Sequence, residues 1–324
     1  MLLAAAAILI GLVILVWGAD RFVLGAAALA SSLGISPLLI GLTVVGFGTS
    51  APEILIATIA ALNGSPGIAI GNALGSNIAN IALILGATAL FSPLTVRSDM
   101  LRREYPLLLA VSAGAFLLLM DGHLGVIDGI ILLNGLVICM LLLVRIGLRR
   151  RDHDPLAEEM EAEIPSDLSA LAASAWFLVG LAALVVSSRM LVWGAIEIAV
   201  AFGISDLVIG LTIVAVGTSL PELAAAIMSA VKNEHDLAIG NVVGSNIWNL
   251  LAVLGIPGLL APGVIPPEVA NRDMLVMLAL TLALFMMGRS SHTHGTINRL
   301  EGGLLLSAFI AYQGWIVWQS YAVA

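Results

Sequence analysis

Charged residues are scarce in this chain of 324 residues: they make up 10% of it, whereas hydrophobic residues make up 60%. The mean hydropathy is +1.09. One soluble core could not bury so many apolar side chains, so this composition excludes a soluble globular domain. Apolar runs of the roughly 20 residues that cross a bilayer recur along the whole chain. The sequence therefore predicts a single integral membrane unit surrounded by the lipid bilayer.

Cysteine is also scarce, and imidazole is missing from the interior of the apolar runs. Cys139 is the one cysteine, which excludes an intramolecular disulfide, and we expect it to be a small core residue. No apolar run contains a GxSG nucleophile motif, and the histidines lie in loops or at the ends of runs: His123, His153, His235, His292 and His294. We therefore expect no enzyme, no cofactor, no zinc site and no nucleic-acid partner, and no obligatory protein partner is evident.

Ten apolar runs are bounded by charge, glycine or proline, which predicts an all-α polytopic membrane protein with ten transmembrane helices. No basic residue precedes the first run and no small-residue cleavage site follows it, so we expect a retained span and not a signal peptide. The predicted spans are 2–31, 37–62, 67–92, 104–121, 124–147, 169–200, 206–231, 236–260, 273–288 and 303–321.

The basic residues predict which side of the membrane each loop faces. With both termini outside, only Arg272 flanks an outer loop, and the positive-inside rule is satisfied. We assign no transport role to Arg21 or Arg189, which lie inside long spans. The residues that then flank cytoplasmic loops are Arg97, Arg102, Arg103, Arg145, Arg149, Arg150, Arg151, Lys232, Arg289 and Arg299.

An internal repeat relates the two halves of the chain. Residues 34–86 align without a gap with residues 203–255, at a constant offset of 169. Each copy occupies the second and third spans of a five-span half, and five is odd, so the halves cross the membrane in opposite directions. The sequence predicts two inverted five-helix repeats, residues 1–147 and 169–324, joined by a cytoplasmic linker at 148–168. Such repeats place a substrate near the midplane, on helices interrupted by glycine or proline.

Each copy carries one acidic residue in mid-span, Glu53 in GFGTSAPE and Glu222 in AVGTSLPE. A carboxylate is costly at this depth, and the matching segments contain no lysine or arginine to pair with it. The alternative is a protonated, hydrogen-bonded glutamate in the core, which the symmetric duplication disfavours. Proline before each glutamate frees a backbone carbonyl, and glycines relax the same turn: Pro52, Pro221, Gly46, Gly48 and Gly217.

Further oxygen-bearing side chains recur at helical spacing. Thr49 and Thr218 each precede a glutamate by four residues, which places them one turn away. Two stripes with a spacing of four follow in the third and eighth spans, namely Asn72, Ser76 and Asn80, and Asn241, Ser245 and Asn249. Whether Asn72 and Asn241 pack helices together or serve the site is open. Nearby GxxxG patterns favour close helix packing: Gly71, Gly75, Gly240 and Gly244.

Carboxylates, amides, hydroxyls and freed carbonyls suit a hard cation. Calcium takes about six to eight oxygens in flexible geometry, and two carboxylates balance its charge, whereas magnesium keeps its waters.

The motifs resemble those of the calcium/cation antiporter superfamily, in particular its prokaryotic sodium/calcium exchanger branch, whose two alpha-repeats carry GTSxPE and GNxxGSN. The resemblance covers the whole chain and implies a location in a prokaryotic cell membrane.

The resemblance implies roles for individual residues. The calcium site would comprise Glu53, Glu222 and the carbonyls of Thr49 and Thr218, supported by Ser50 and Ser219. One sodium site would use Gly46, Thr49, Ser76 and Glu53, and its mirror image Ala215, Thr218, Ser245 and Glu222. Asn80 and Asn249 would border a middle position. Some family members, including potassium-dependent ones, have aspartate in place of Asn249, so potassium coupling is not implied.

The expected function is secondary antiport of Ca²⁺ against Na⁺ by alternating access, because both ions compete for the same oxygens. The first and sixth spans, long and poor in polar residues, are the candidates to slide. A proton/calcium (or other cation) antiporter would use the same carboxylates. A cation channel would also use acidic residues, but without saturable counter-flow.

Overall fold

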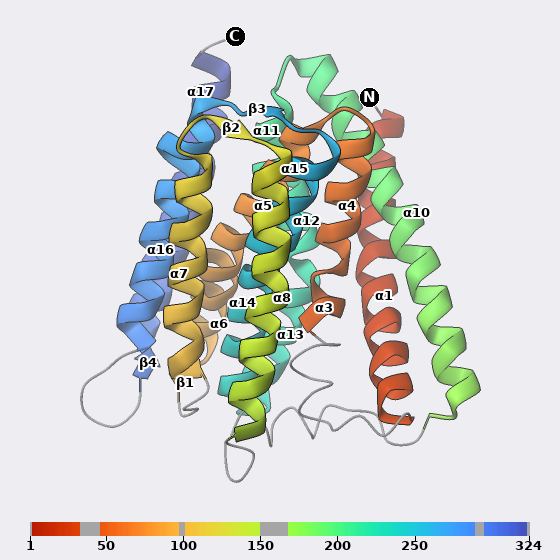
Figure 1. Ribbon diagram of the computed structural model, residues 1–324, viewed down its shortest axis with the longest axis vertical. Coiled ribbons are helices and arrows are strands. Elements are labelled where there is room, and N and C mark those ends of the chain that lie inside the picture. Colours follow the sequence, from red (N-terminus) through yellow and green to blue (C-terminus); the bar gives the residue numbers. More distant parts are fainter. Residues whose placement is uncertain (1, 33–45, 97–100, 150–167, 289–294, 323–324) are drawn as a thin grey trace.

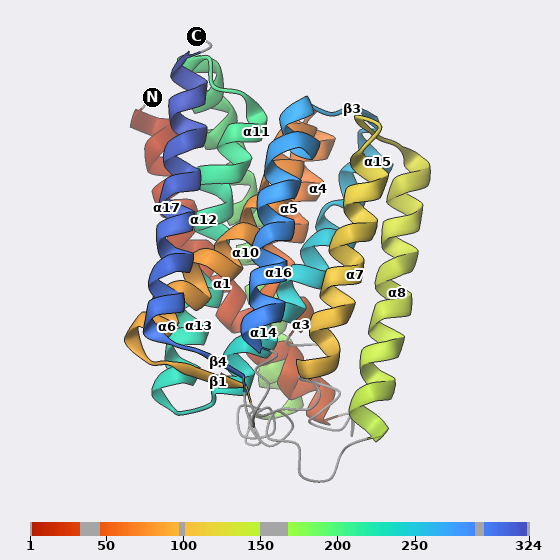
Figure 2. The same ribbon diagram turned by 90° about the vertical axis from the view of Figure 1, so that its left-hand side faces the viewer.

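The computed structural model describes residues 2–32, 46–96, 101–149, 168–288 and 295–322, which form a bundle of helices running along the long axis (Figure 1). The start of α1 (Leu2–Ser32) and the end of α17 (Arg299–Ala322) lie at the same end of the bundle (Figures 1 and 2). We call this the terminal end and the other the distal end. Predictions for residues 33–45, 97–100, 150–167 and 289–294 lie outside the described residues.

The predicted spans coincide with helical stretches of the structure to within a few residues, apart from 37–45. After α1, the first half contains α3 (Gly46–Thr49), α4 (Ala51–Leu62), α5 (Pro66–Ile78), η2 (Ala79–Leu85), α6 (Gly86–Phe91), β1 (Leu94–Val96), α7 (Leu101–Leu119), β2 (His123–Leu124) and α8 (Val126–Arg149). The second half contains α10 (Ala170–Phe202), α11 (Asp206–Ile209), η3 (Gly210–Val214), α12 (Ala215–Thr218), α13 (Leu220–Val231), α14 (His235–Trp248), η4 (Asn249–Val253), α15 (Gly255–Leu260), β3 (Gly263–Val264), η5 (Val269–Asp273), α16 (Met274–Gly288), β4 (Gly295–Ile297) and α17.

Within the described residues, six helical stretches are long and apolar enough to cross a membrane, or seven when the bent pair Asp206–Thr218 and Leu220–Val231 is counted as one. The protein is therefore a helical, polytopic membrane protein. The remaining apolar helices are shorter: Ala51–Leu62, Glu104–Leu119 and Val126–Leu142. The count of ten spans stays a prediction.

Two pairs of short antiparallel strands, which the sequence did not predict, join the connections at the two ends of the bundle. β1 pairs with β4 at the distal end, and β2 pairs with β3 at the terminal end (Figure 1). Residues 94–96 of β1 correspond, at the repeat offset, to residues 263–265, where β3 lies. Equivalent segments of the two copies thus form strands at opposite ends.

The repeated segments also share a turn. Gly64 ends the α4–α5 turn at the terminal end with φ 77°, and Asn233 ends the α13–α14 turn at the distal end with φ 64°. These residues are equivalent at the repeat offset, and this left-handed conformation favours glycine and asparagine. Equivalent positions therefore make the same chain reversal at both ends, although most residues of the two turns differ.

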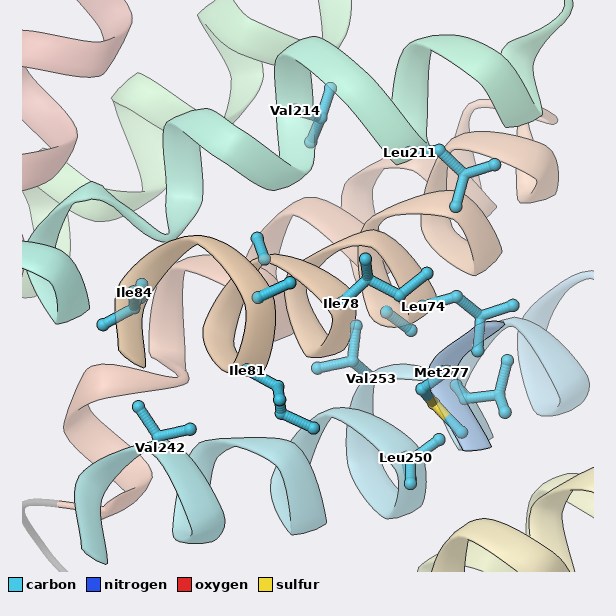
Figure 3. Packing of buried hydrophobic residues seen from close by; sticks show 14 of the residues in the cluster. Leu74, Ile78, Ile81, Ile84, Leu211, Val214, Val242, Leu250, Val253 and Met277 are labelled. Carbon is cyan, nitrogen blue, oxygen red and sulfur yellow. The ribbon is translucent and has the colours of Figure 1, made fainter. Parts of the chain in front are cut away.

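The centre of the bundle is formed by the repeated segments and not by the long helices. In the most apolar 18-residue window of Pro66–Phe91 78% of the residues are buried, against 22% in that of Ala170–Phe202. Figure 3 shows apolar side chains of α5, η2, η4 and α16 packed together: Leu74, Ile78, Ile81, Leu250, Val253 and Met277. The polar residues of both repeats are therefore held in a dry, tightly packed interior.

α1 and α10 lie side by side at the edge of the bundle (Figure 1). Their backbones touch at glycines: a Cβ on Gly25 would lie 2.3 Å from the Phe177 nitrogen, and one on Gly180 would lie 2.3 Å from the Phe22 nitrogen. Arg21 of α1 forms an ion pair with Asp20 at 3.3 Å and lies over the Trp176 ring. The guanidinium group of Arg21 therefore interacts with other residues of the α1–α10 pair.

Candidate cation-binding site

Each repeat contains a broken helix with its glutamate directly after the break. α3 ends at Thr49 and α4 begins at Ala51, with Ser50 between them at φ −89°, ψ 0°. The equivalent Ser219 has φ −82°, ψ 0°, and the helices on either side of it are bent by 41°. The sequence predicted a proline kink; the structure places the break at the serine, two residues before each proline.

The prolines lie in the first turn of the helix that follows the break. Pro52 is the second residue of α4 and Pro221 the second residue of α13, positions where a backbone N–H would have no partner within the helix. Proline is therefore tolerated there, and its fixed φ helps the helix to restart. The last carbonyls of α3 and α12 face the same breaks.

The two carboxylates begin these half-helices. Glu53 is 1% exposed and Glu222 is 2% exposed, and both belong to the first turn of their helix. The positive end of the helix dipole favours a negative charge at this position. Among the described residues, no hydrogen bond of good geometry is made to either oxygen of either carboxylate or to the Ser50 and Ser219 hydroxyls, and the Thr218 side chain lies beside the Glu53 carboxyl group.

The two carboxyl groups interact electrostatically with each other across the interface between the halves. Two buried negative charges without counter-charge would destabilise the fold strongly. The described residues contain no group of three or more His, Cys, Asp or Glu that could hold a metal ion, so the described part of the candidate site offers at most Glu53 and Glu222 as acidic ligands.

The threonines and serines of the two repeats meet in reciprocal pairs. The hydroxyls of Thr49 and Ser245 lie 3.3 Å apart, and those of Ser76 and Thr218 also lie 3.3 Å apart. At the repeat offset Thr49 corresponds to Thr218 and Ser76 corresponds to Ser245, so the second contact is the first with the halves exchanged. The sites around both glutamates are thus built jointly by both halves.

Asn72 joins this group of hydroxyls. Its Oδ1 accepts hydrogen bonds from Thr218 at 3.2 Å and from Ser76 at 3.4 Å, and its Nδ2 donates to the Glu53 carbonyl at 3.3 Å. These hydrogen bonds link α5 to the helices that carry Glu53 and Thr218, so they fit both roles that the sequence left open for Asn72, and its part in the site stays a prediction. The structure gives no such bond for Asn241.

The asparagines farther along the same helices form a second polar group. Asn80 Nδ2 donates to Asn246 Oδ1 at 3.0 Å, and Asn77 Nδ2 donates to the Asn246 carbonyl at 3.3 Å. Asn249 is 1% exposed, and neither of its amide atoms has a hydrogen-bond partner among the described residues. The sequence analysis did not single out Asn77 and Asn246, although the repeated GSN tripeptide contains both.

The structure therefore places most predicted site residues around the two helix breaks. Two predicted ligands act through backbone carbonyls only, Gly46 at the start of α3 and Ala215 at the start of α12. The Ala215 carbonyl already accepts from the Ser219 nitrogen at 3.1 Å and from the Thr218 hydroxyl at 3.2 Å. A cation bound at Ala215 would compete with these bonds.

The fold and its buried polar centre define a helical membrane transporter. The family model described as Sodium/calcium exchanger protein matches residues 3–145 and 172–318. The chain belongs to this family, within the prokaryotic sodium/calcium exchanger branch of the calcium/cation antiporter superfamily, and the prediction of this membership is confirmed. The family consists of transporters, not enzymes.

Individual relatives match over almost the whole chain. "Putative antiporter CaxA" of Alkalimonas amylolytica is 50% identical over 313 residues, 97% of this chain and 98% of the relative. "Sodium/calcium exchanger MaX1" of Methanosarcina acetivorans is 33% identical, covering 94% of this chain and 96% of the relative. A solved structure of the sodium-calcium exchanger NCX_Mj, soaked with 2.5 mM Na⁺ and 1 mM Sr²⁺, is 34% identical with a TM-score of 0.68, covering 96% and 97% of the two chains.

Proposed function

We propose that this protein is a secondary antiporter that exchanges Ca²⁺ for Na⁺ across the membrane by alternating access. The main supporting observation is the pair of buried carboxylates, Glu53 and Glu222, which interact with each other and form no ion pair with a basic side chain among the described residues. A divalent cation between them offsets both charges. Where calcium leaves, sodium ions or protons have to take its place, because the empty, ionised site is unfavourable.

The ligands that we propose are oxygens only. Calcium is held by Glu53 and Glu222 with the carbonyls of Thr49 and Thr218, supported by Ser50 and Ser219. The sodium sites use Gly46, Ala215, Ser76 and Ser245 in addition, and Asn80 and Asn249 border the middle position. This set suits hard cations, which prefer carboxylate, carbonyl and hydroxyl oxygens.

The architecture that we propose is ten spans in two inverted repeats, residues 1–147 and 169–324. The reciprocal hydroxyl pairs and the equivalent turns at Gly64 and Asn233 support it, because exchanging the halves reproduces both features. Inverted halves let one occupied site face either side of the membrane in turn. The exposed α1–α10 pair is the part proposed to slide against the buried core.

The orientation that we propose has both termini outside and the linker at 148–168 in the cytoplasm. Arg145 near the end of α8, Lys232 after α13 and Arg299 at the start of α17 all lie at the distal end, whereas Arg272 lies toward the terminal end (Figure 1). Since basic residues favour the cytoplasmic side, the distal end is the cytoplasmic one. For a bacterial relative such as "Inner membrane protein YrbG" of Escherichia coli this is the inner membrane.

The test of coupling is radiolabelled calcium uptake into proteoliposomes under an imposed sodium, potassium or proton gradient. Calcium uptake driven by a sodium gradient at fixed pH is the expected result, because hydroxyls flank both glutamates and offer more small-cation positions than a proton relay needs. Uptake driven equally well by a proton gradient in sodium-free buffer would reject sodium coupling in favour of proton/calcium exchange. Calcium flux without counter-flow would indicate a channel.

Removing the paired hydroxyls tests the sodium sites. In Ser76→Ala and Ser245→Ala the sodium concentration for half-maximal exchange should rise by about threefold to tenfold, since a neutral hydrogen-bonding or ligating hydroxyl contributes about 1 kcal/mol. The calcium concentration for half-maximal uptake should change less, because the proposed calcium site does not use these hydroxyls. Calcium flux titrated against each ion measures both values; an equal change in both contradicts the assignment.

A charge at the middle position should change the ion dependence. Asn249→Asp adds a third carboxylate beside two others, and we expect transport to become sensitive to pH or potassium, because like charges in a buried site favour protonation or an extra cation. The measurement is calcium uptake by wild type and variant across pH and potassium concentration. Identical profiles for the two proteins would show that position 249 does not face the ion site.

A further inference from the structure

The repeat symmetry of the candidate site is broken at the four asparagines. Asn77 and Asn80 correspond to Asn246 and Asn249 at the repeat offset. Asn80 Nδ2 donates to Asn246 Oδ1 at 3.0 Å. With the halves exchanged, this bond becomes one from Asn249 Nδ2 to Asn77 Oδ1. Among the described residues those two atoms are buried and have no hydrogen-bond partner. One bond of a symmetric pair is made and the other is open.

The bond that is made determines what Asn80 offers to an ion. An asparagine amide presents either an acceptor oxygen, which attracts a cation, or a donor NH₂, which repels one. Because Asn80 Nδ2 is engaged by Asn246, its Oδ1 points elsewhere, and this oxygen is buried without a hydrogen-bond partner among the described residues. The oxygen of Asn80 is thus kept free as a ligand. Asn249, with both amide atoms unbonded, is not fixed in this way.

Asn246 is itself held from the other repeat. Asn77 Nδ2 donates to the Asn246 carbonyl at 3.3 Å and lies 3.5 Å from the Met277 sulfur. Asn77 is 1% exposed and Asn246 is 1% exposed, so water does not compete for these groups. The two residues lie where α5 and α14 give way to the π-helices η2 and η4. A wider helical turn of this kind is often found at functional sites.

We propose that Asn246 and Asn77 are positioning residues that turn the amide oxygens of Asn80 and Asn249 toward the transported ion, with one bond made in each access state. The structure shows the state in which Asn80 is oriented. When the halves exchange conformations, the Asn249–Asn77 bond forms and the Asn80–Asn246 bond opens. This proposal rests on the cation exchange proposed above and adds to it the residues that decide when each amide is a ligand.

The experiment is a double-mutant cycle with Asn246→Leu, Asn80→Ala and the two combined, read as the sodium concentration for half-maximal calcium exchange in proteoliposomes, because Asn80 borders the middle position and is not one of the proposed calcium ligands. We expect Asn246→Leu to raise this concentration about tenfold. Without the hydrogen bond to Asn246 the Asn80 amide is no longer oriented, and losing its contact with the ion costs about as much free energy as losing one hydrogen bond. The double variant should then equal Asn80→Ala alone, because Asn246 acts only through Asn80. Asn246→Ala, which also removes the acceptor, replaces the leucine variant if that protein does not accumulate in the membrane.

A parallel cycle with Asn77→Leu and Asn249→Ala addresses the bond that is open in this structure. Turnover visits both access states, so this pair should also be non-additive. Asn134→Ala is the matched control, because Asn134 bonds only to the Ile130 carbonyl of its own helix on the exposed side of α8, and its value should equal that of the wild type.

The outcomes separate the two proposals. Additive effects in the Asn80–Asn246 cycle, with a wild type that exchanges calcium, overturn the positioning role and leave the exchange function standing. Additive effects in the Asn77–Asn249 cycle alone overturn the alternation of the two bonds. A wild type that takes up no calcium under any cation gradient overturns the proposed function itself.

Discussion

Calcium exchange by Glu53→Gln should fall by about 100-fold or more while the protein remains folded. Glu53 is one of the two buried carboxylates that balance the charge of calcium in the proposed site, and removing one partner of such a buried carboxylate–cation pair costs about 3 to 5 kcal/mol. Since about 1.4 kcal/mol corresponds to tenfold in affinity, calcium binding is lost at ordinary concentrations. Glutamine keeps the size of the side chain, so packing around α4 is retained.

Glu222→Gln should have the same effect, because Glu222 holds the equivalent position at the start of α13. Radiolabelled calcium uptake in proteoliposomes measures exchange, and size-exclusion elution in detergent verifies the fold. Glu197→Gln on the exposed side of α10 is the matched control and should exchange like the wild type. Uptake near the wild-type level by either site variant would exclude the two glutamates as the centre of the site.

Gly71→Ala should destabilise the protein by about 1 to 3 kcal/mol, the usual cost of overpacking. A Cβ on Gly71 would lie 2.5 Å from the Leu207 carbonyl oxygen and 2.8 Å from the Leu211 nitrogen. Both are backbone atoms, so one helix has to move. The facing helix approaches as closely, since a Cβ on Gly210 of η3 would lie 2.6 Å from the Ile68 carbonyl oxygen of α5.

The measurement is thermal unfolding in detergent, together with calcium uptake. Because Gly71 precedes Asn72, a shift of α5 away from η3 also moves the amide that holds Thr218, and exchange should fall together with stability. Gly114→Ala is the control, because no described atom lies within 4 Å of a Cβ added there. An unfolding temperature of Gly71→Ala equal to that of Gly114→Ala would show that the close approach of α5 and η3 is not needed.

The GxxxG pattern at Gly71 and Gly75 was thus a sound basis for predicting close packing in the first repeat. A Cβ on Gly75 would lie 2.6 Å from the Ala215 Cβ. For Gly244 in the second repeat, no described atom lies within 4 Å of an added Cβ. Gly75 packs against Leu211, and the position equivalent to Leu211 in the first repeat, residue 42, lies outside the described residues, so close packing at Gly244 stays a prediction.

The sequence by itself determined the features that depend on residues close together along the chain. Hydropathy places the helices, because a bilayer selects apolar runs of a given length. The gapless repeat pairs Glu53 with Glu222, and it also pairs Gly64 with Asn233, which adopt the same turn. The family follows from the same motifs, since they are short, local and repeated.

The tertiary structure alone decided which residues of one repeat meet which residues of the other. Thr49 pairs with Ser245 and Asn80 with Asn246, contacts between residues far apart in the chain that no spacing rule predicts. The helix breaks at Ser50 and Ser219, and the π-helical turns at Asn80 and Asn249, depend on how the two halves pack. The two repeats share the GSN tripeptide and the following asparagine, yet one asparagine hydrogen bond is made and its equivalent is not, because the packing of the two halves and not the repeat symmetry fixes the conformation of these side chains.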